Sequence, residues 1–253
     1  MPRLKRFIPL TLAISLAPLL AGCGDRWGWY VVSPQTLNGK NNLLFLLGGL
    51  QYTVLLSVVA MVLSVILGLL VALPAFSKNR GLRAFNIAYV EFVRAIPPLV
   101  LILWIYYGLP IVSDIVINVF WAGVLAVAVS DSPFVAEIFR AGIQAVPQGQ
   151  KEAAQSLGLP KRPTFRLIVM PQALRTILPA LANQFVLVLK VSSLVSVIGL
   201  SDLTRRANEL VTTEYRPLEI YTILIFEYLA LVLIISSLVR RFEKRLNRGQ
   251  ERG

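Results

Sequence analysis

The chain has 253 residues, of which 56% are hydrophobic and 15% are charged, whereas an ordinary soluble domain is about half apolar and about one-quarter charged. The formal net charge is +12, but the basic residues cluster at the ends of apolar segments and form no basic stripe, which disfavours nucleic-acid binding. Histidine is absent and there is one cysteine, so the sequence offers neither imidazole chemistry nor an intrachain disulfide.

The first 23 residues form a signal-like segment, with a basic start and an apolar core of signal-peptide proportions. The segment ends "LAGC" at Cys23. This ending resembles a bacterial lipobox, in which the cysteine is lipidated and the preceding peptide is removed. The alternative is a sixth, N-terminal hydrophobic helix. Both interpretations place residues 24–42 outside the cell, where Trp27 and Trp29 suit the membrane interface.

Five long apolar segments follow, and they predict an all-α polytopic membrane protein. Each run approaches or exceeds the roughly 20 residues that cross a bilayer, and the mean hydropathy of the chain is +0.70. The predicted spans are residues 43–76, 84–110, 115–139, 177–200 and 218–239. They define a transmembrane domain over residues 43–240, which is followed by a basic tail at 241–253.

The positions of lysine and arginine predict the orientation of the spans. Residues 77–83 carry three basic residues and no acid, residues 140–175 carry six against one glutamate, and residues 240–253 carry six more. The alternate connections are poorer, because residues 201–216 balance three bases with three acids. Basic loops face the cytoplasm. We therefore expect the first span to begin outside and the C-terminus to lie inside.

Residues 140–175 form a polar insert between the third and fourth predicted spans. It contains "EAAQSLGLPKRPTFRLIVMP", in which Gly158 followed by Pro160 is a signal for the end of a helix. We expect Thr164 to cap a second short helix that ends before Pro171. The two alanines after Glu152 offer a small helix face that a partner can approach closely. On composition alone, helices lying on lipid headgroups are the alternative.

The insert resembles the EAA motif of ATP-binding-cassette importer permeases. The matching residues are Glu152, Ala153, Ala154, Gly158, Ile168 and Pro171, with Met170 standing where leucine is usual. Segments such as "YVEFVRAIPPLV", "MPQALRTILPALANQF" and "SLVSVIGLSDL" extend the resemblance over about residues 46–245. They are similar to the polar amino-acid branch of these permeases, which includes histidine, glutamine, arginine and opine systems.

The resemblance implies a type I importer fold in the bacterial inner membrane and a role in amino-acid uptake. In this family the EAA loop docks on a separate ATPase subunit, so the six matching residues are expected to couple the permease to ATP hydrolysis. The implied partners are that ATPase, a second permease chain in a homodimer or heterodimer, and an extracytoplasmic substrate-binding protein. The translocation pathway would then be formed by the permease dimer.

The residues themselves argue against ATP hydrolysis by this chain. A P-loop requires a glycine, four further residues and then the sequence Gly-Lys-Ser/Thr. The only Gly-Lys pair is Gly39-Lys40, with Pro34 at the first glycine position and Asn41 after the lysine. We therefore expect a transport subunit without enzymatic activity, cofactor or metal site of its own, whose partner binds ATP and Mg²⁺.

Ionisable residues inside spans are costly and are candidates for the substrate pathway. The candidates are Asp131, Glu137 and Lys190, with Ser192 beside the lysine. Structural pairing is the alternative. Glu137 and Arg140 are three residues apart and can pair within one helix. For Asp131 and Lys190, pathway lining, structural pairing and snorkelling to the interface all stay open. Glu91 and Arg94 are weaker candidates with the same three-residue spacing.

One departure from the family pattern leaves the identity of the substrate undetermined. Relatives commonly have an aspartate after the lysine of this segment, where this chain has Val191. Compensation by Asp131 would favour a cationic amino acid, while an opine, a sulfur-containing amino acid or another small organic solute are alternatives.

Two other classes of membrane protein fit the sequence less well. A membrane-embedded enzyme would need a nucleophile–base pair or a metal cluster. A stand-alone secondary transporter would carry internal hydropathy symmetry, which the two halves of this chain lack.

Overall fold

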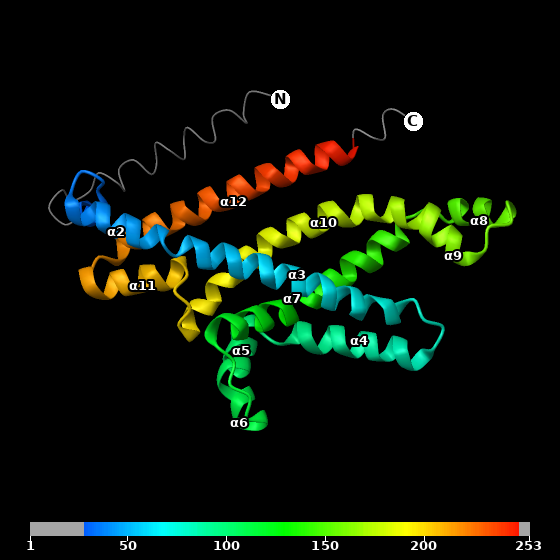
Figure 1. Ribbon diagram of the computed structural model, residues 1–253, viewed down its shortest axis with the longest axis horizontal. Helices are drawn as coiled ribbons and strands as arrows, with labels where there is room; N and C mark the ends of the chain where they lie inside the picture. The colour runs from blue at the N-terminus through cyan, green and yellow to red at the C-terminus, as the bar shows by residue number, and fades with distance from the viewer. Residues whose placement is uncertain (1–27, 248–253) are drawn as a thin grey trace, which may run out of the picture.

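The computed structural model describes residues 28–247, and every secondary-structure element in that range is helical (Figure 1). The signal-like segment, Cys23 and the last six residues of the tail lie outside the described residues. The elements before the polar insert are η2 (Trp29–Val32), α2 (Leu37–Leu47), α3 (Leu50–Ala75), α4 (Arg80–Ala95), α5 (Pro98–Leu103), η3 (Trp104–Gly108), α6 (Leu109–Ser113) and α7 (Val119–Gln144). The remaining elements are α8 (Gln148–Ser156), α9 (Lys161–Thr164), η4 (Phe165–Val169), α10 (Met170–Val191), η5 (Ser192–Ile198), α11 (Leu203–Glu214) and α12 (Pro217–Asn247).

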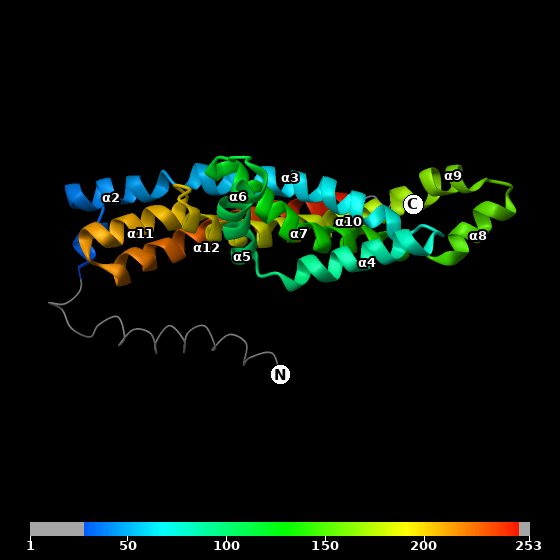
Figure 2. The ribbon, with the colours of Figure 1, turned by 90° about the horizontal axis from the view of Figure 1, so that it is seen from below.

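The long helices lie side by side along the long axis of an elongated molecule. Helices α8 and α9 form one end, while η2, α2 and α11 form the other end (Figure 2). Four helical stretches of the described chain are long and apolar enough to cross a membrane, and the bent pair formed by α4 and α5–α6 makes up to five. The prediction of an all-helical membrane protein is confirmed, whereas the orientation of the spans stays a prediction.

The second predicted span, residues 84–110, is broken in the structure. Helix α4 meets the α5–α6 segment at a bend of 95°. The break lies at Ile96 and Pro97, which are both extended, with ψ values of 122° and 134°. A residue before proline is pushed out of the helical region, and Pro98 then begins α5 at a position that tolerates proline. The α5–α6 segment therefore projects sideways from the bundle (Figure 1).

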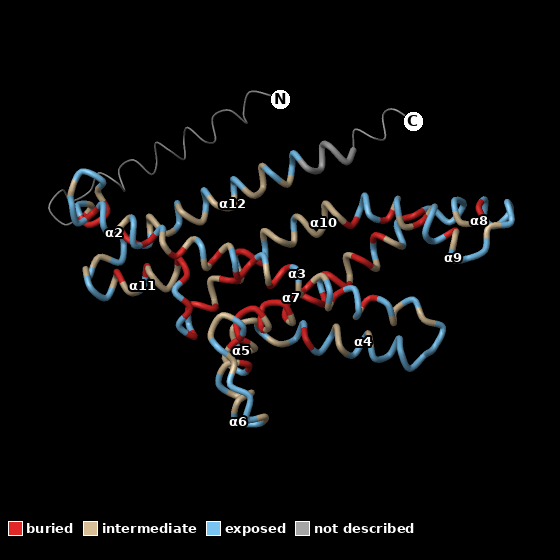
Figure 3. Tube along the Cα trace, in the orientation of Figure 1, coloured by how far each residue is buried: buried red, intermediate tan, exposed pale blue. Residues whose placement is uncertain are grey.

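The core lies where α3 packs against α7, and small residues permit the close approach. A Cβ atom built on Gly68 of α3 would lie 2.5 Å from Val135 Cγ1 of α7. Leu56, Ala60 and Val124 are fully buried in the same region, which forms the central buried part of the trace in Figure 3. Close packing between backbones therefore holds the two central helices together.

A second apolar cluster holds the opposite end of the molecule together. Its buried members are Val31, Val32, Leu46, Ala207, Leu210 and Ile220.

Asp202 caps α11 by accepting a hydrogen bond from the Arg205 N–H at 2.8 Å. Burial raises the pKa of the Asp202 carboxyl to about 6, because a charged form is disfavoured away from water. This end is therefore a packed unit in which the Asp202 carboxyl group is costly to ionise.

Candidate functional site

The predicted coupling loop forms a short, tightly closed helix, α8, at one end of the molecule. Pro147 precedes the helix, and Gly158 follows its last turn with φ of +79°. The Gly158 N–H donates to the Gln155 carbonyl at 2.9 Å, and the Leu159 N–H donates to the Ala154 carbonyl at 3.1 Å. These two bonds make a Schellman motif, which needs a left-handed residue such as glycine. The predicted stop at Gly158 is therefore found in the backbone.

The two alanines of the motif face in different directions. Ala154 is 4% exposed, whereas Glu152, Ala153 and Leu157 are exposed. The prediction of one small face containing both alanines is wrong, because consecutive residues on a helix do not share a face. Ala154 instead is buried on the helix that packs against α9 and η4. The surface open to a partner is formed by Glu152, Ala153 and Leu157.

The segment after Gly158 corrects a second expectation. Pro160 precedes α9, and Thr164 closes it by donating to the Pro160 carbonyl at 3.1 Å. Thr164 is therefore no N-cap, and the chain continues through η4 into α10 past Pro171. Proline inside a helix clashes with the carbonyl four residues earlier, and the π-turn Phe165–Val169 provides the local widening that admits it. Predicting a stop at Pro171 was wrong.

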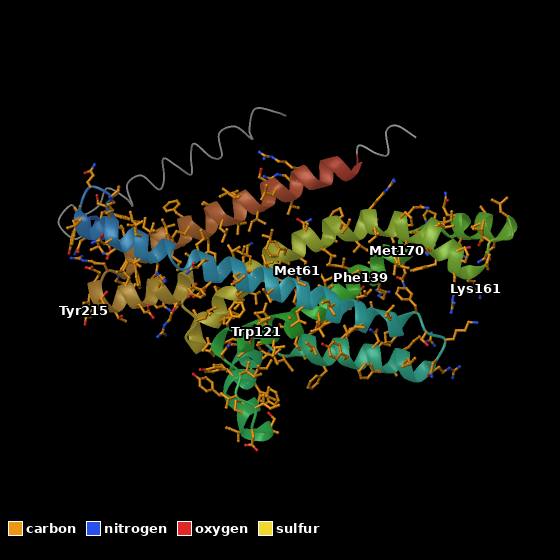
Figure 4. All side chains as sticks on the ribbon, in the orientation of Figure 1. Met61, Trp121, Phe139, Lys161, Met170 and Tyr215 are labelled. Carbon is orange, nitrogen blue, oxygen red and sulfur yellow. The ribbon has the colours of Figure 1, made fainter. Side chains whose placement is uncertain are left out.

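The loop and the ends of the spans enclose two cavities. One, of about 440 Å³, lies at the base of the loop beside Pro147, Gln150 and Arg175. The other, of about 330 Å³, lies between α8, α9 and the end of α3, where Lys151, Lys161 and Phe165 line it. Figure 4 places Lys161 at this end of the molecule and Tyr215 at the opposite end. Glu152, Ala153, Ala154 and Gly158 of the EAA motif therefore lie in the loop that forms this end of the molecule.

Asp131 lies in the packed centre and lines a cavity of its own. The carboxylate is on α7 and accepts hydrogen bonds from the Ser64 hydroxyl of α3, at 2.6 Å, and from the Gln184 amide of α10. The cavity has a volume of about 260 Å³ and is lined by Asp131, Ser130, Phe134 and Gln184, among apolar side chains. Asp131 therefore links three helices and also faces a cavity.

Ser64 and Gln184 were not predicted from the sequence. Both are polar residues inside apolar spans. The sequence signal for Gln184 is its polar amide within the apolar stretch "ANQFVLVLK". Sequence spacing alone does not show which polar side chains of different spans lie opposite one another.

Glu137 is engaged in local pairing. It accepts from Arg140 Nε at 2.9 Å and forms a second contact with the same guanidinium, which also donates to Gln144 at 2.9 Å. The Glu91–Arg94 pair does not form. The Arg94 guanidinium lies instead over the Phe134 ring, 4.8 Å from its centroid.

The remaining pathway candidates do not join Asp131. Lys190 is exposed and lines a separate cavity of about 530 Å³, together with Ser193, Thr204 and Tyr228. Ser192 is 1% exposed, and its hydroxyl donates to the Leu189 carbonyl at 2.8 Å. Among residues 28–247, no group of three potential metal-ligating side chains comes together. The four pathway candidates therefore occupy different environments.

Comparison with known proteins gives a match over most of the chain. Residues 64–248 match the family model described as "Binding-protein-dependent transport system inner membrane component". The arginine transport system permease protein ArtQ of Bacillus subtilis is 36% identical over 202 residues, covering 80% of this chain and 92% of that protein. The glutamine transport system permease protein GlnP of Escherichia coli K12 is 33% identical over 205 residues, covering 79% and 92%.

A solved structure is also similar. A crystal structure of an amino acid ABC transporter with histidines contains a chain that is 41% identical, with a TM-score of 0.78. The match covers 83% of the present chain and 97% of that chain.

Proposed function

Because the chain belongs to the family of binding-protein-dependent transport system inner membrane components, we propose that it is the permease subunit of an ATP-driven importer of amino acids. It is a transport subunit with the type I importer fold, and ATP hydrolysis belongs to a separate subunit. The observation that carries the proposal is helix α8, which is closed at Gly158 and projects beyond the ends of the spans.

Helix α8 is suited to transmit movement between subunits. Pro147 joins it to α7, and the turn at Gly158 leads directly to the α9–α10 run. Glu152 presents an exposed carboxylate for charge-assisted hydrogen bonds with a docked ATPase, while Leu157, 81% exposed, adds apolar contact. Buried Ala154 anchors the helix. Ile168 and Pro171 lie on the segment that would carry movement into α10.

The remaining organisation follows from the charge pattern. We place the α8–α9 loop and the basic tail in the cytoplasm and the η2–α2–α11 end outside, because basic loops face the cytoplasm. Residues 24–42 would then meet an extracytoplasmic substrate-binding protein, and a second permease chain would complete the pathway. Cys23 would be lipidated and residues 1–22 removed, or this N-terminal segment would add a sixth helix.

Asp131 is the strongest candidate for the substrate pathway. Its cavity contains the polar groups of Ser130 and Gln184 within apolar walls, an arrangement typical of small-molecule sites. The names of the relatives include glutamine and arginine, so a polar amino acid is the favoured substrate class. Lys190 is a candidate for a separate, groove-lining position, whereas Glu137 and Ser192 are already occupied by Arg140 and by the Leu189 carbonyl.

Transport in reconstituted vesicles tests this function. The permease would be co-purified with its ATPase and reconstituted with its binding protein, and accumulation of labelled L-glutamine and L-arginine would be measured with and without ATP. Accumulation that requires ATP supports the proposal. Accumulation that continues without ATP, driven by an ion gradient, contradicts it and favours a secondary transporter. Failure of both substrates, with other small solutes accumulated under ATP, would shift the substrate class to an opine or a related compound.

A further inference from the structure

A cleft with charged walls lies between α4 and α7, closed behind by the end of α3. Its volume is about 440 Å³, within the range of ligand sites. The polar residues that line it are Arg83, Asn86, Glu91, Arg94, Glu137, Arg140 and Gln144. Figures 1 and 2 show α4 running beside α7 toward the α8–α9 end of the molecule. The cleft therefore lies on the side that we place toward the cytoplasm.

The charges of this cleft are only partly satisfied by the protein. Glu137 and Arg140 neutralise each other. No ion pair involves Arg83, Glu91 or Arg94 within the part of the chain that the structure describes. The Arg83 guanidinium and the Glu91 carboxylate of α4 are thus available to a ligand, while the Arg94 guanidinium lies over the Phe134 ring.

These groups match the chemistry of a zwitterion. A guanidinium donates two parallel hydrogen bonds to a carboxylate, which suits Arg83 or Arg94, and the Glu91 carboxylate accepts from an ammonium group. The Asn86 amide nitrogen already donates to the Val71 carbonyl at 2.6 Å, so the Asn86 oxygen remains an acceptor for the same ammonium. An anion without an ammonium group would leave the Glu91 carboxylate without a partner.

The cleft is separate from the Asp131 cavity but adjoins it. The two have no lining residue in common. Glu137 follows Asp131 by six residues on α7, which places it about 9 Å further along the helix. Arg94 connects the two sites, because it lines the cleft while its guanidinium lies against Phe134, a lining residue of the Asp131 cavity.

We propose that the α4–α7 cleft is a second binding site, for the zwitterionic head of a free amino acid on the cytoplasmic side. The proposal rests on the permease function. A ligand held by Arg83 and Glu91 of α4 and by Gln144 of α7 links two helices. Gln144 is the last residue of α7 and lies three residues before Pro147. Occupancy therefore opposes movement of the coupling loop and slows the transport cycle.

The experiment uses the complete transporter in sealed vesicles with the ATPase facing outward. Binding protein and substrate are enclosed, ATP is added outside, and ATP hydrolysis is measured while L-glutamine or L-arginine is added outside. We expect inhibition of the wild-type complex. Glu91→Gln and Arg83→Gln should each raise the half-inhibitory concentration roughly tenfold, because each loses a charge-assisted hydrogen bond. Arg80→Gln, on the same helix but outside the cleft, is the matched control and should behave as wild type.

Two further arms identify the ligand. The α-N-acetyl derivatives, which lack the ammonium group, should inhibit poorly. Vesicles with and without phosphatidylethanolamine separate a free amino acid from a lipid headgroup of the same chemistry, and inhibition should be the same in both. Absence of inhibition, equal inhibition of all variants, or dependence on the lipid would overturn the proposal. The hydrolysis rate without added amino acid reports the permease function independently. If Glu91→Gln fails to assemble, Arg83→Gln carries the test.

Discussion

The α3–α7 centre and the α8–α9 loop are built by opposite means. The centre is held by buried side chains, small residues and a carboxylate with two hydrogen-bond donors. The loop is held by backbone geometry at Gly158 and by one buried alanine, with Glu152, Ala153 and Pro171 of the motif exposed. Changes in the centre should therefore reduce stability, whereas changes in the loop should reduce coupling between subunits while the bundle stays folded.

The largest loss of stability is expected for Gly68→Val. A Cβ at this position would lie 2.5 Å from Val135 Cγ1 and 3.0 Å from the Ala136 nitrogen, so α3 and α7 must move apart. Overpacking of this kind costs about 3 kcal/mol. Thermal unfolding of the purified complex measures the effect. Leu70→Val, at a position 58% exposed, is the control, and equal midpoints for the two variants would disprove the close contact.

Asp131→Ala should destabilise the centre by about 2 kcal/mol, because the Ser64 hydroxyl and the Gln184 amide would lose a buried partner. Asp131→Asn keeps an acceptor and should lose less. Combining Asp131→Ala with Ser64→Ala in a double-mutant cycle measures the coupling between the two side chains. Strict additivity would show that the bond contributes nothing.

Gly158→Ala tests whether the loop contributes to coupling between subunits and not to the stability of the bundle. A residue with a side chain at φ of +79° costs about 1 kcal/mol, confined to the end of α8. We expect the unfolding midpoint of the bundle to change little and the substrate-stimulated ATPase rate to fall. Gly149→Ala on the same helix meets no atom within 4 Å and should leave both quantities unchanged. A large drop in the midpoint for Gly158→Ala would mean that the loop is part of the folding core.

The smallest effect is expected at Asp202. Its pKa is about 6 in the folded protein against 3.8 ordinarily, so the folded state binds the proton more tightly. The resulting stabilisation is fully present below pH 3.8 and is lost as pH rises through 6. Asp202→Asn removes the buried charge but also its favourable interaction with the N-terminal dipole of α11, and the opposing effects leave about 1 kcal/mol or less at neutral pH. Unfolding midpoints at pH 5 and pH 8 should differ less in this variant than in wild type, and an unchanged difference would contradict the account.

Hydropathy predicted the long helices because a helix that crosses the hydrocarbon core of a bilayer must consist mostly of apolar residues. The end of α8 was also predictable, since glycine followed by proline has few other uses at that spacing. Pro171 was misread because a π-turn can admit a proline, and that turn depends on packing beyond the local sequence. The partners of Asp131 were missed because periodicity assigns residues to faces of one helix but does not pair faces of different helices.

The central claim is that α8 docks the ATPase, and affinity co-purification from native membranes tests it most directly. The wild-type chain should bring down an ATPase subunit whose activity rises with substrate. The double variant Glu152→Lys with Gly158→Pro should still insert into the membrane but release the ATPase. Lys40→Glu, an exposed charge reversal at the opposite end of the molecule, should retain it. If the double variant keeps the ATPase bound, or if the wild-type chain brings none down, the docking role of α8 is wrong.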